Sequence, residues 1–327
     1  MTGGVASAPI RRVVGVALNA AIDKTVSVDR LVAGSIHRPV VRSVVAGGKA
    51  ANVVRAARHL GLDGAMVAVL GGHAGAWYRA QLDERSIALH EVSVADETRT
   101  CLSVLDESTG KLTEFYEAGV RLRDGDWRAV ETALRAAIGG DGSGVVVVLA
   151  GSLPPGTPVD GYARLAAVAA EAGARTAVDS DGDSLAAALA GKPWLVKVNA
   201  SEAESVTGSS SRTADRAAAA AAELRARGAE IAIVTRGVHG AALATAGGAW
   251  ALGNLPAALR GPYSVGSGDA FLAGFLAGVS QGLPAPDALR LAGAAGAANA
   301  RVPGQGELDP ADVDRIRQRL VVEADPV

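Results

Sequence analysis

Residues 145–179 read VVVVLAGSLPPGTPVDGYARLAAVAAEAGARTAVD. The stretch opens with an uninterrupted apolar run, turns through a loop rich in Gly and Pro, continues as an Ala-rich amphipathic segment, and closes with a second apolar run. Short apolar strands without polar alternation are typical of parallel sheets that are buried on both faces. A strand, a helix and a strand in this order predict one β-α-β unit of such a sheet.

The same alternation runs through most of the chain. It predicts a doubly wound α/β fold, in which a mostly parallel central sheet carries helices on both faces. We interpret residues 10–327 as a single domain and residues 1–9 as a disordered tail. The predicted strands are 11–18, 65–70, 145–150, 175–179, 195–198 and 231–235, and the predicted helices are 49–60, 74–86, 126–138, 159–172, 214–227, 269–281, 285–299 and 310–320.

Two pairs of segments alternate polar and apolar residues instead, as half-exposed strands do. They are residues 25–28 with 40–45, and residues 100–105 with 111–116. Turn-like connections around Gly34-Ser35 and at residues 107–110 join the two members of each pair. We expect a small β-sheet outside the main sheet, a lid inserted at about residues 24–46 and 98–118.

The composition excludes several functions. The 327 residues carry a formal net charge of −2, and aromatic residues make up 3% of them. A nucleic-acid or anionic-membrane partner is therefore not expected, because the electrostatic footprint and the stacking platforms are missing. Cys101 is the one cysteine, the five histidines lack metal-ligand spacing, and no segment is apolar enough for a signal peptide or a membrane span. We expect a soluble, cytoplasmic protein.

The segment Gly266-Ser267-Gly268-Asp269, followed by the apolar run 270–279, carries the clearest chemical signal. Two glycines let the backbone turn tightly and leave its N–H groups uncovered, and the following helix directs its positive end to the same point. A carboxylate there can take a proton from an attacking hydroxyl. Donors for phosphate charge beside a base predict a phosphoryl-transfer site. The alternative is an N-capping Asp after a flexible turn.

Residues 46–52, AGGKAAN, form the second signal. The glycine pair allows a ligand to approach the backbone, and Lys49 and Asn52 project from the first turn of the helix that follows. A lysine at a helix N-terminus is unfavourable with respect to the helix dipole, and a bound anion removes that conflict. The spacing differs from that of a Walker A loop. The alternative is a glycine hinge with a solvated lysine.

Two charged residues accompany these segments. Asp23 follows the first predicted strand, where α/β sheets bind ligands, and its carboxylate can accept hydrogen bonds from sugar hydroxyls. Arg99 opens a lid strand and can hold a phosphate with two parallel hydrogen bonds. The alternatives are a turn aspartate and an exposed arginine at a strand edge.

Three further loops end predicted strands on the same side of the sheet: residues 151–156, 197–202 and 235–240. The first is a rigid loop rich in Gly and Pro, and the third supplies a hydroxyl and two glycines suited to nucleotide phosphates. Asn199 and Glu202, three residues apart at a helix start, can orient a hydrated Mg²⁺. A helix cap with Glu at its third position explains the same spacing.

Taken in order, these segments resemble the ribokinase-like (PfkB) family of carbohydrate kinases from about residue 13 to residue 320. The segments 266–270 and 46–52 look like the two signatures of that family. The closer likeness within it is to 1-phosphofructokinases and tagatose-6-phosphate kinases, and residues 97–99 and 151–154 contribute to it. The departures include Ala20 and Val198 at positions where the family usually has proline.

The resemblance implies a role for each motif residue. Asp269 is the catalytic base, and the N–H groups of Gly266, Ser267 and Gly268 form an anion hole for the transferring γ-phosphoryl group. The sugar is held by Asp23, Gly47, Gly48 and Asn52, and its existing phosphate by Lys49, Arg99 and Ser152. ATP faces Lys197, Asn199, Thr235, Gly237 and Gly240, with room for adenine at Gly293 and Gly296, and Glu202 organises Mg²⁺ through water.

The implied reaction is the transfer of the γ-phosphoryl group of ATP to a primary hydroxyl of a sugar phosphate, with fructose 1-phosphate as the first expectation. Tagatose 6-phosphate, fructose 6-phosphate, an unphosphorylated sugar and a nucleoside are alternative acceptors. A non-catalytic sugar-phosphate sensor is the alternative from another class. The resemblance also implies Mg²⁺, allows a monovalent cation, and predicts a homodimer formed through the lid.

Overall fold

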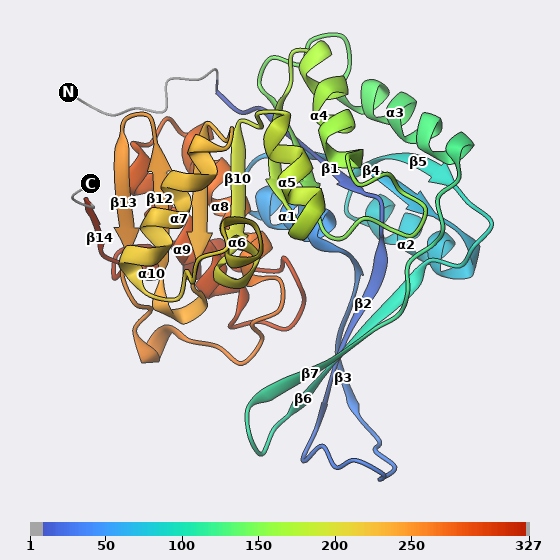
Figure 1. Ribbon diagram of the computed structural model, residues 1–327. Coiled ribbons are helices and arrows are strands. Elements are labelled where there is room, and N and C mark those ends of the chain that lie inside the picture. Colours follow the sequence, from blue (N-terminus) through green and yellow to red (C-terminus); the bar gives the residue numbers. More distant parts are fainter. Residues whose placement is uncertain (1–8, 325–327) are drawn as a thin grey trace.

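The computed structural model describes residues 9–324, and a ten-stranded sheet forms the centre of that part of the chain (Figure 1). Its strand order is β14-β13-β12-β11-β10-β9-β8-β1-β4-β5. The seven strands from β11 to β5 are mutually parallel, whereas β12, β13 and β14 pair in antiparallel fashion. The strands are β1 Arg12–Ala17, β4 Asp63–Leu70, β5 Ala88–Ser93, β8 Val145–Ala150, β9 Arg175–Asp179, β10 Leu195–Asn199, β11 Ile231–Thr235, β12 Ala241–Thr245, β13 Gly248–Leu252 and β14 Val322–Ala324.

Helices cover both faces of this sheet, because the strands are apolar on both sides. Along β1, Val13 and Ala17 face one hydrophobic core, whereas Val14 and Val16 face the other. The first core is closed by α1 Lys49–His59, α2 Gly72–Glu84, α8 Ser267–Ser280, α9 Ala285–Asn299 and α10 Pro310–Arg317. The second is closed by α3 Asp124–Ile138, α4 Gly161–Glu171, α5 Gly182–Ala190, α6 Ala200–Thr207 and α7 Ala214–Ala226. The predicted doubly wound α/β architecture is confirmed.

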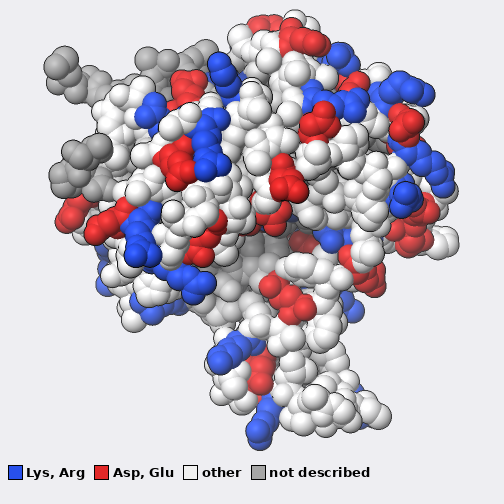
Figure 2. All heavy atoms as spheres, in the orientation of Figure 1, with Lys and Arg blue, Asp and Glu red and all other residues white. Residues whose placement is uncertain are grey.

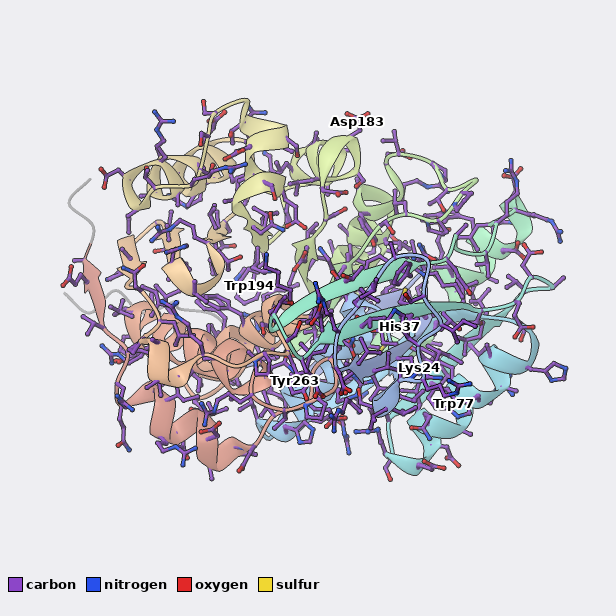
Figure 3. The ribbon with its side chains drawn as sticks, turned by 90° about the horizontal axis from the view of Figure 1, so that it is seen from below. Lys24, His37, Trp77, Asp183, Trp194 and Tyr263 are labelled. Carbon is purple, nitrogen blue, oxygen red and sulfur yellow. The ribbon has the colours of Figure 1, made fainter. Side chains whose placement is uncertain are left out.

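A second sheet of four strands projects from this body as an arm (Figure 1). Its order is β3-β2-β6-β7, built from β2 Ala21–Val28, β3 Val40–Gly47, β6 Arg99–Asp106 and β7 Lys111–Tyr116. Val26, Val28 and Val104 form a small core of its own. Seen from below, the strands of the arm lie across the front of the body, and the arm carries Lys24 and His37 (Figure 3). The small extra sheet predicted from the alternating segments is therefore confirmed.

Helix α8 is the most deeply buried helix of the fold and packs between α1 and α9. Its apolar residues surround the helix on all sides, as in a helix without a solvent face. A Cβ atom at Gly274 or Gly278 would come within 2.8 Å of α9 atoms, so these two glycines allow the close approach of the two helices. The close packing of α8 against α9 therefore fixes the position of its amino end, which lies at the carboxyl ends of the strands.

Several elements were missed by the sequence analysis. Strand β5 lies at the sheet edge and is half-exposed, so its apolar signal is weak. Helices α5 and α6 are short, and the strand sequence AALAT of β12 is as compatible with a helix as with a strand. Strand β14, which follows the last predicted helix and completes the sheet beside β13, was also missed. The predicted tail, residues 1–9, lies outside the described residues except for Pro9.

The strand order locates the ligand crevice. From β1 the chain continues to β4 and β5 on one side, whereas β8, β9, β10 and β11 follow one another on the other side. Ligands of open α/β sheets bind outside the carboxyl ends of the strands at such a reversal. Within the described residues no helix is both long and apolar enough to cross a bilayer.

Candidate active site

A cavity of about 770 Å³ opens at the carboxyl ends of these strands, between the body and the arm. A hollow is visible at this place in the space-filling view (Figure 2), and charges of both signs are interspersed over that face. The arm contributes residues of β2, β6 and β7 to the lining, and the body contributes the amino ends of α1 and α8 and one side of α9. The cavity therefore touches every segment that the sequence singled out as chemical.

The amino end of α8 forms one wall. Gly266 is the N-cap residue, with a φ of 83°, and a Cβ atom there would lie 2.8 Å from Cα of Gln305. Only glycine fits this turn. Asp269 is the third residue of α8, so the alternative that it caps the helix is wrong. The residues described here supply no hydrogen-bond acceptor for the N–H groups of Gly266, Gly268 and Asp269, which suits an anion.

Ser267 differs from the expectation. Its N–H donates to the carbonyl oxygen of Ser264 at 3.2 Å, so in this structure it belongs to the turn rather than to an open anion hole. The Oγ atom of Ser267 is buried and has no hydrogen-bond partner in the described part of the chain. The hydroxyl, rather than the amide, is the free donor at this residue.

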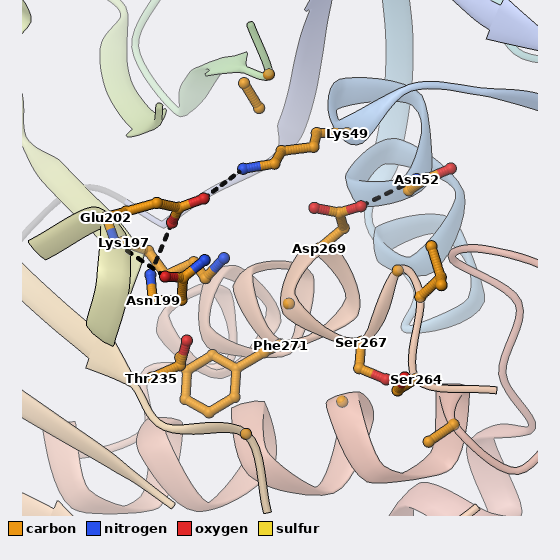
Figure 4. Close-up of a pocket in the computed structure, with 18 of the residues that line it drawn as sticks. Lys49, Asn52, Lys197, Asn199, Glu202, Thr235, Ser264, Ser267, Asp269 and Phe271 are labelled. Atoms are coloured by element: carbon orange, nitrogen blue, oxygen red, sulfur yellow. Dashed lines mark hydrogen bonds and ion pairs between the residues drawn. The ribbon is translucent and has the colours of Figure 1, made fainter. Parts of the chain in front are cut away.

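The carboxylate of Asp269 is 6% exposed and lies on the cavity wall. Its Oδ2 accepts a hydrogen bond of 2.9 Å from Nδ2 of Asn52 (Figure 4). Burial, together with the charge of Asp179, raises the pKa of Asp269 to about 7, although Lys197, Lys49 and Asn52 oppose the rise. No ion pair of Asp269 is found among residues 9–324. This carboxylate is therefore free to accept a proton near neutral pH.

Two lysines converge on a buried aspartate next to it. Nζ of Lys49 lies 2.7 Å from Oδ1 of Asp179, and Nζ of Lys197 contacts Oδ2 of the same carboxylate. Burial opposes ionisation of Asp179, but the two ammonium groups lower its pKa below the ordinary value. A Cβ atom at Gly268 would lie 3.0 Å from Nζ of Lys197, so this ammonium group sits at the amino end of α8.

Asp179 was missed by the sequence analysis, although it is the last residue of a correctly predicted strand. Lys49 lies at the amino end of α1, where the helix dipole disfavours a positive charge, and two carboxylates explain how this position is tolerated. Carboxylates of Asp179 and Glu202, at 2.7 and 3.1 Å, offset the unfavourable position of its charge, so the alternative of a solvated lysine is wrong.

Asn199 and Glu202 form a capping box at the start of α6. The side chain of Asn199 accepts from the N–H of Glu202 at 3.0 Å, and Glu202 accepts from the N–H of Asn199 at 2.8 Å (Figure 4). The capping alternative is confirmed. Among the described residues no group of three or more His, Cys, Asp or Glu side chains is arranged to hold a metal ion. The oxygens of Asn199 and Glu202 are of the kind that Mg²⁺ takes as ligands, but in this structure they accept hydrogen bonds or pair with Lys49, so they fit the ion only at a distance, through its bound waters.

The root of the arm forms the opposite end of the cavity. Asp23 is buried, and its Oδ2 accepts from the N–H of Gly48 at 3.2 Å. Burial raises the pKa of Asp23 to about 6, against the lowering effect of Gly48, Arg55, Arg99 and Asn52. Gly48 lines the cavity with a φ of 91°. Gly47 does not line it; a Cβ atom there would collide with the side chain of Asp23, so Gly47 makes room for that carboxylate.

Arg99 lies on the cavity wall at the start of β6. Strand β6 runs between β2 and β7, so the alternative of an exposed arginine at a strand edge is wrong. Nη2 donates to the carbonyl oxygen of Asn19 at 3.3 Å. Nδ2 of Asn19 in turn donates to Oγ of Ser152 at 3.1 Å. Asn19 thus links two predicted substrate residues, a position that the sequence analysis did not assign to the site.

The far end of the cavity is apolar. Leu252, Leu255, Phe271, Ala297 and Leu320 line it beside Thr235, Gly237, Gly240, Gly293 and Gly296. A Cβ atom at Gly293 would lie 2.5 Å from Cδ2 of Leu252, so this glycine brings α9 against β13. The hydroxyl of Thr235 donates to the carbonyl oxygen of Val198 at 3.3 Å. An apolar slot with small residues on one side suits a flat ring such as adenine.

Comparison with known proteins agrees with this geometry. The model of the pfkB family of carbohydrate kinases matches residues 13–312. A 1-phosphofructokinase of Xanthomonas campestris pv. campestris is 37% identical over 267 residues, which cover 80% of this chain and 82% of that protein. An ATP-dependent 6-phosphofructokinase isozyme 2 of Mycobacterium tuberculosis is 31% identical over 305 residues, 93% of this chain and 88% of that protein. The predicted resemblance is confirmed.

A solved structure shares the fold. The tetrameric inhibited form of phosphofructokinase-2 from Escherichia coli superposes with a TM-score of 0.84 at 26% identity, and the match covers 95% of this chain and 99% of that chain. The central sheet with its helices and small second sheet is therefore the ribokinase-like architecture that the resemblance implied.

Proposed function

Because the chain belongs to the pfkB family and is an ATP-dependent carbohydrate kinase, we propose that its acceptor is fructose 1-phosphate, which it converts to fructose 1,6-bisphosphate. The observation that carries the proposal is the unpaired carboxylate of Asp269 at the amino end of α8, on the wall of a cavity with a charged end and an apolar end. The 37% identity to a 1-phosphofructokinase supports the choice of acceptor.

In the proposed reaction, Asp269 takes the proton of the acceptor hydroxyl. The oxygen of that hydroxyl bonds to the γ-phosphorus of ATP, and the bond between this phosphorus and the ADP oxygen breaks. The uncovered N–H groups of Gly266 and Gly268, and the ammonium group of Lys197, stabilise the charge on the transferring phosphoryl oxygens. Asp23, Gly48 and Asn52 hold the sugar, and Arg99 with Ser152 holds its phosphate. Most of the rate enhancement then comes from positioning and electrostatics.

Lys49 has a different place in this scheme from the one predicted. The ammonium group of Lys49 lies between Asp179 and Glu202, 2.7 and 3.1 Å from their oxygens. We therefore assign it to the region between the phosphate of the sugar and the γ-phosphate of ATP, rather than to the sugar phosphate alone. Glu202 and Asn199 would hold Mg²⁺ through its bound waters, and the ion would supply further positive charge to the phosphates of ATP. A monovalent cation stays a prediction, and so does a cytoplasmic location.

Fructose 6-phosphate is the second candidate, because the Mycobacterium tuberculosis relative that matches 93% of this chain is a 6-phosphofructokinase. Release of ADP, measured with a coupled assay over fructose 1-phosphate, fructose 6-phosphate, tagatose 6-phosphate, ribose and a nucleoside, distinguishes the candidates. Fructose 1-phosphate should give the highest kcat/KM. Turnover with ribose or the nucleoside alone would contradict the proposal, and no turnover with any acceptor would favour a sugar-phosphate sensor.

The rate should depend on pH near neutrality. Only the ionised form of Asp269 accepts a proton, and its pKa is raised to about 7, so kcat should fall as the pH falls below that value and level off above it. Initial rates at saturating ATP and acceptor test this. A profile that stays flat down to about pH 5 would contradict the assignment of the base.

Replacing Arg99 with Ala should raise KM for the sugar phosphate by roughly 10- to 100-fold and change kcat less. The reason is that the variant lacks a charge-assisted hydrogen bond to the phosphate, which contributes about 1.5–3 kcal/mol to binding. Steady-state kinetics of the variant measure both constants. Arg42→Ala is a matched control, because Arg42 lies on the same arm and pairs with Glu107 outside the cavity. An unchanged KM in the Arg99 variant would point to an unphosphorylated acceptor.

We further propose that the protein forms a homodimer through the arm. It exposes Ile36, Val40, Val41, Phe115 and Tyr116, and Ile36 is 88% exposed. These residues come from the loop before β3, from β3 and from β7, all of them parts of the arm, and exposed apolar side chains concentrated on one part of a molecule mark interaction surfaces. Light scattering after size exclusion should give the mass of a dimer for the wild type and of a monomer for Ile36→Asp with Val41→Asp. Val321→Asp, at an apolar residue that is also exposed but lies outside the arm, should leave the mass unchanged.

A further inference from the structure

Arg55 lies directly behind the site, on helix α1, and is 2% exposed. It is three residues from Asn52 and therefore on the same face of the helix. Nη1 of Arg55 donates to Oδ1 of Asn52 at 3.2 Å and also to the carbonyl oxygen of Gln305, and Nη2 donates to the carbonyl oxygen of Ala46; Nε has no hydrogen-bond partner among the described residues. A buried guanidinium with this set of acceptors has a fixed position.

These contacts determine which way the amide of Asn52 points. An amide presents an oxygen acceptor on one side and an NH₂ donor on the other. The guanidinium of Arg55 has only donors, so it requires the oxygen on its own side. The NH₂ group must then face the cavity, where it donates to Oδ2 of Asp269 at 2.9 Å and also contributes a hydrogen bond that lowers the pKa of Asp23.

The same arginine joins three backbone segments around Asp269. Ala46 precedes the glycine pair of the sugar end, Asn52 lies in α1, and Gln305 lies in the loop against which Gly266 packs. A Cβ atom at Gly306 would collide with the carbonyl oxygen of Asn52, so this loop also touches α1. The charge of Arg55 is balanced by Glu307, 3.6 Å away, which also pairs with Arg85 at 2.9 Å and with His59 at 3.0 Å.

We propose that Arg55 is a positioning residue of the kinase reaction: by holding the oxygen of the Asn52 amide, it forces the amide NH₂ onto Asp269 and keeps the second carboxylate oxygen free for the acceptor hydroxyl. The proposal rests on the proposed role of Asp269 as the base. Arg55 itself does not line the cavity.

The consequence is a change in the proton affinity of Asp269. The groups that face this carboxylate are Asp179 from β9, Lys197 from β10, and Lys49 and Asn52 from α1. Of these, only Asn52 is oriented by Arg55. Once the guanidinium fork is gone, the amide can turn its oxygen toward Asp269, and the hydrogen bond that stabilises the ionised form is lost. The pKa of Asp269 then rises.

The test is Arg55→Lys, which keeps the positive charge but cannot hold the amide oxygen and two carbonyl groups together. We expect the acidic limb of the kcat profile to move up by about one pH unit or more. At pH 7 kcat should fall by about 5-fold for a shift of one unit, because the ionised fraction drops from about one half to about one eleventh, and it should recover toward the wild-type value at high pH. A merely structural defect lowers the rate by one factor at all pH values. Urea denaturation of each variant checks that it is folded.

Arg164→Lys is the matched control. Arg164 pairs with Glu131 at 3.2 Å and lies over the ring of Trp127, on the other face of the sheet, so its profile should superimpose on that of the wild type. In an Asn52→Ala background, Arg55→Lys should cause no further shift of the limb, because the two residues act through one contact. If Arg55→Lys does not fold, Glu307→Gln, which removes the counter-charge, should shift the limb in the same direction by a smaller amount.

A readout without turnover separates this inference from the proposed function. In protein labelled with ¹³C at aspartate carboxyl carbons, the resonance assigned through Asp269→Asn should titrate about one pH unit higher in Arg55→Lys. A superimposed titration overturns the positioning role even if the enzyme is active. A shifted titration in a protein that phosphorylates no acceptor leaves the positioning role standing and contradicts the proposed function.

Discussion

Asp269→Asn is expected to lower kcat by about 10³–10⁴-fold while ATP still binds. The amide has the size of the carboxylate and can keep a contact with Asn52, but it cannot accept the proton of the acceptor hydroxyl. The uncovered N–H groups at the amino end of α8 remain in place, so binding of the nucleotide phosphates should persist. Coupled release of ADP measures kcat, and isothermal titration measures the Kd for ATP.

Asp287→Asn is the control for this change. Asp287 lies in the first turn of α9, where it pairs with Arg290 on the surface, and the same substitution there should leave kcat unchanged. A turnover within about 10-fold of the wild type for Asp269→Asn would rule out this carboxylate as the base.

The second large effect is expected from Asp179→Asn, which should lower the free energy of unfolding by about 3 kcal/mol or more. The substitution leaves the ammonium group of Lys197, a side chain that is 5% exposed, without its counter-charge in the interior. Lys49 is less affected, because Glu202 still lies 3.1 Å away. Urea denaturation followed by circular dichroism measures the difference between the variant and the wild type.

The pH dependence of that difference has a definite sign. The pKa of folded Asp179 is lowered by the two lysines, so its contribution is fully present above the ordinary aspartate pKa and is lost as the pH falls through the lowered value. Asp141→Asn is the control, since Asp141 and Arg11 form a surface pair 3.5 Å apart and the change should cost less than about 1 kcal/mol. A similarly small loss for Asp179→Asn would show that the buried pair is not needed for stability.

Much of the fold was predictable because the apolar runs are unambiguous. Val145–Ala150, Arg175–Asp179 and Ile231–Thr235 were predicted with the bounds that the structure has. The site followed from the fold, because parallel strands bring their carboxyl ends to one edge, and the motif residues come directly after those ends. The sequence could thus predict that Asp23, Lys49 and Asp269 meet.

What could not be predicted are contacts that depend on the distance between side chains far apart in the sequence. Lys49 and Asp179 are separated by 130 positions, and Arg55 and Gln305 by 250. Neither pairing leaves a periodic pattern. Arg55 left only a weak signal, a charged residue between the apolar pairs Val53-Val54 and Ala56-Ala57, three positions after Asn52. The turn that occupies the N–H of Ser267 likewise depends on backbone geometry that a motif does not specify.

The burial of α8 on all sides has a consequence for how the protein becomes active during translation. The residues proposed to hold the sugar lie in the first third of the chain, whereas the proposed base lies on a helix that packs against α9. On the ribosome, a nascent chain that ends before α9 has no partner for the apolar surface of α8. Helix α1, which carries Lys49 and Asn52, also packs against α8, so the site can be completed only when almost the whole polypeptide has been synthesised.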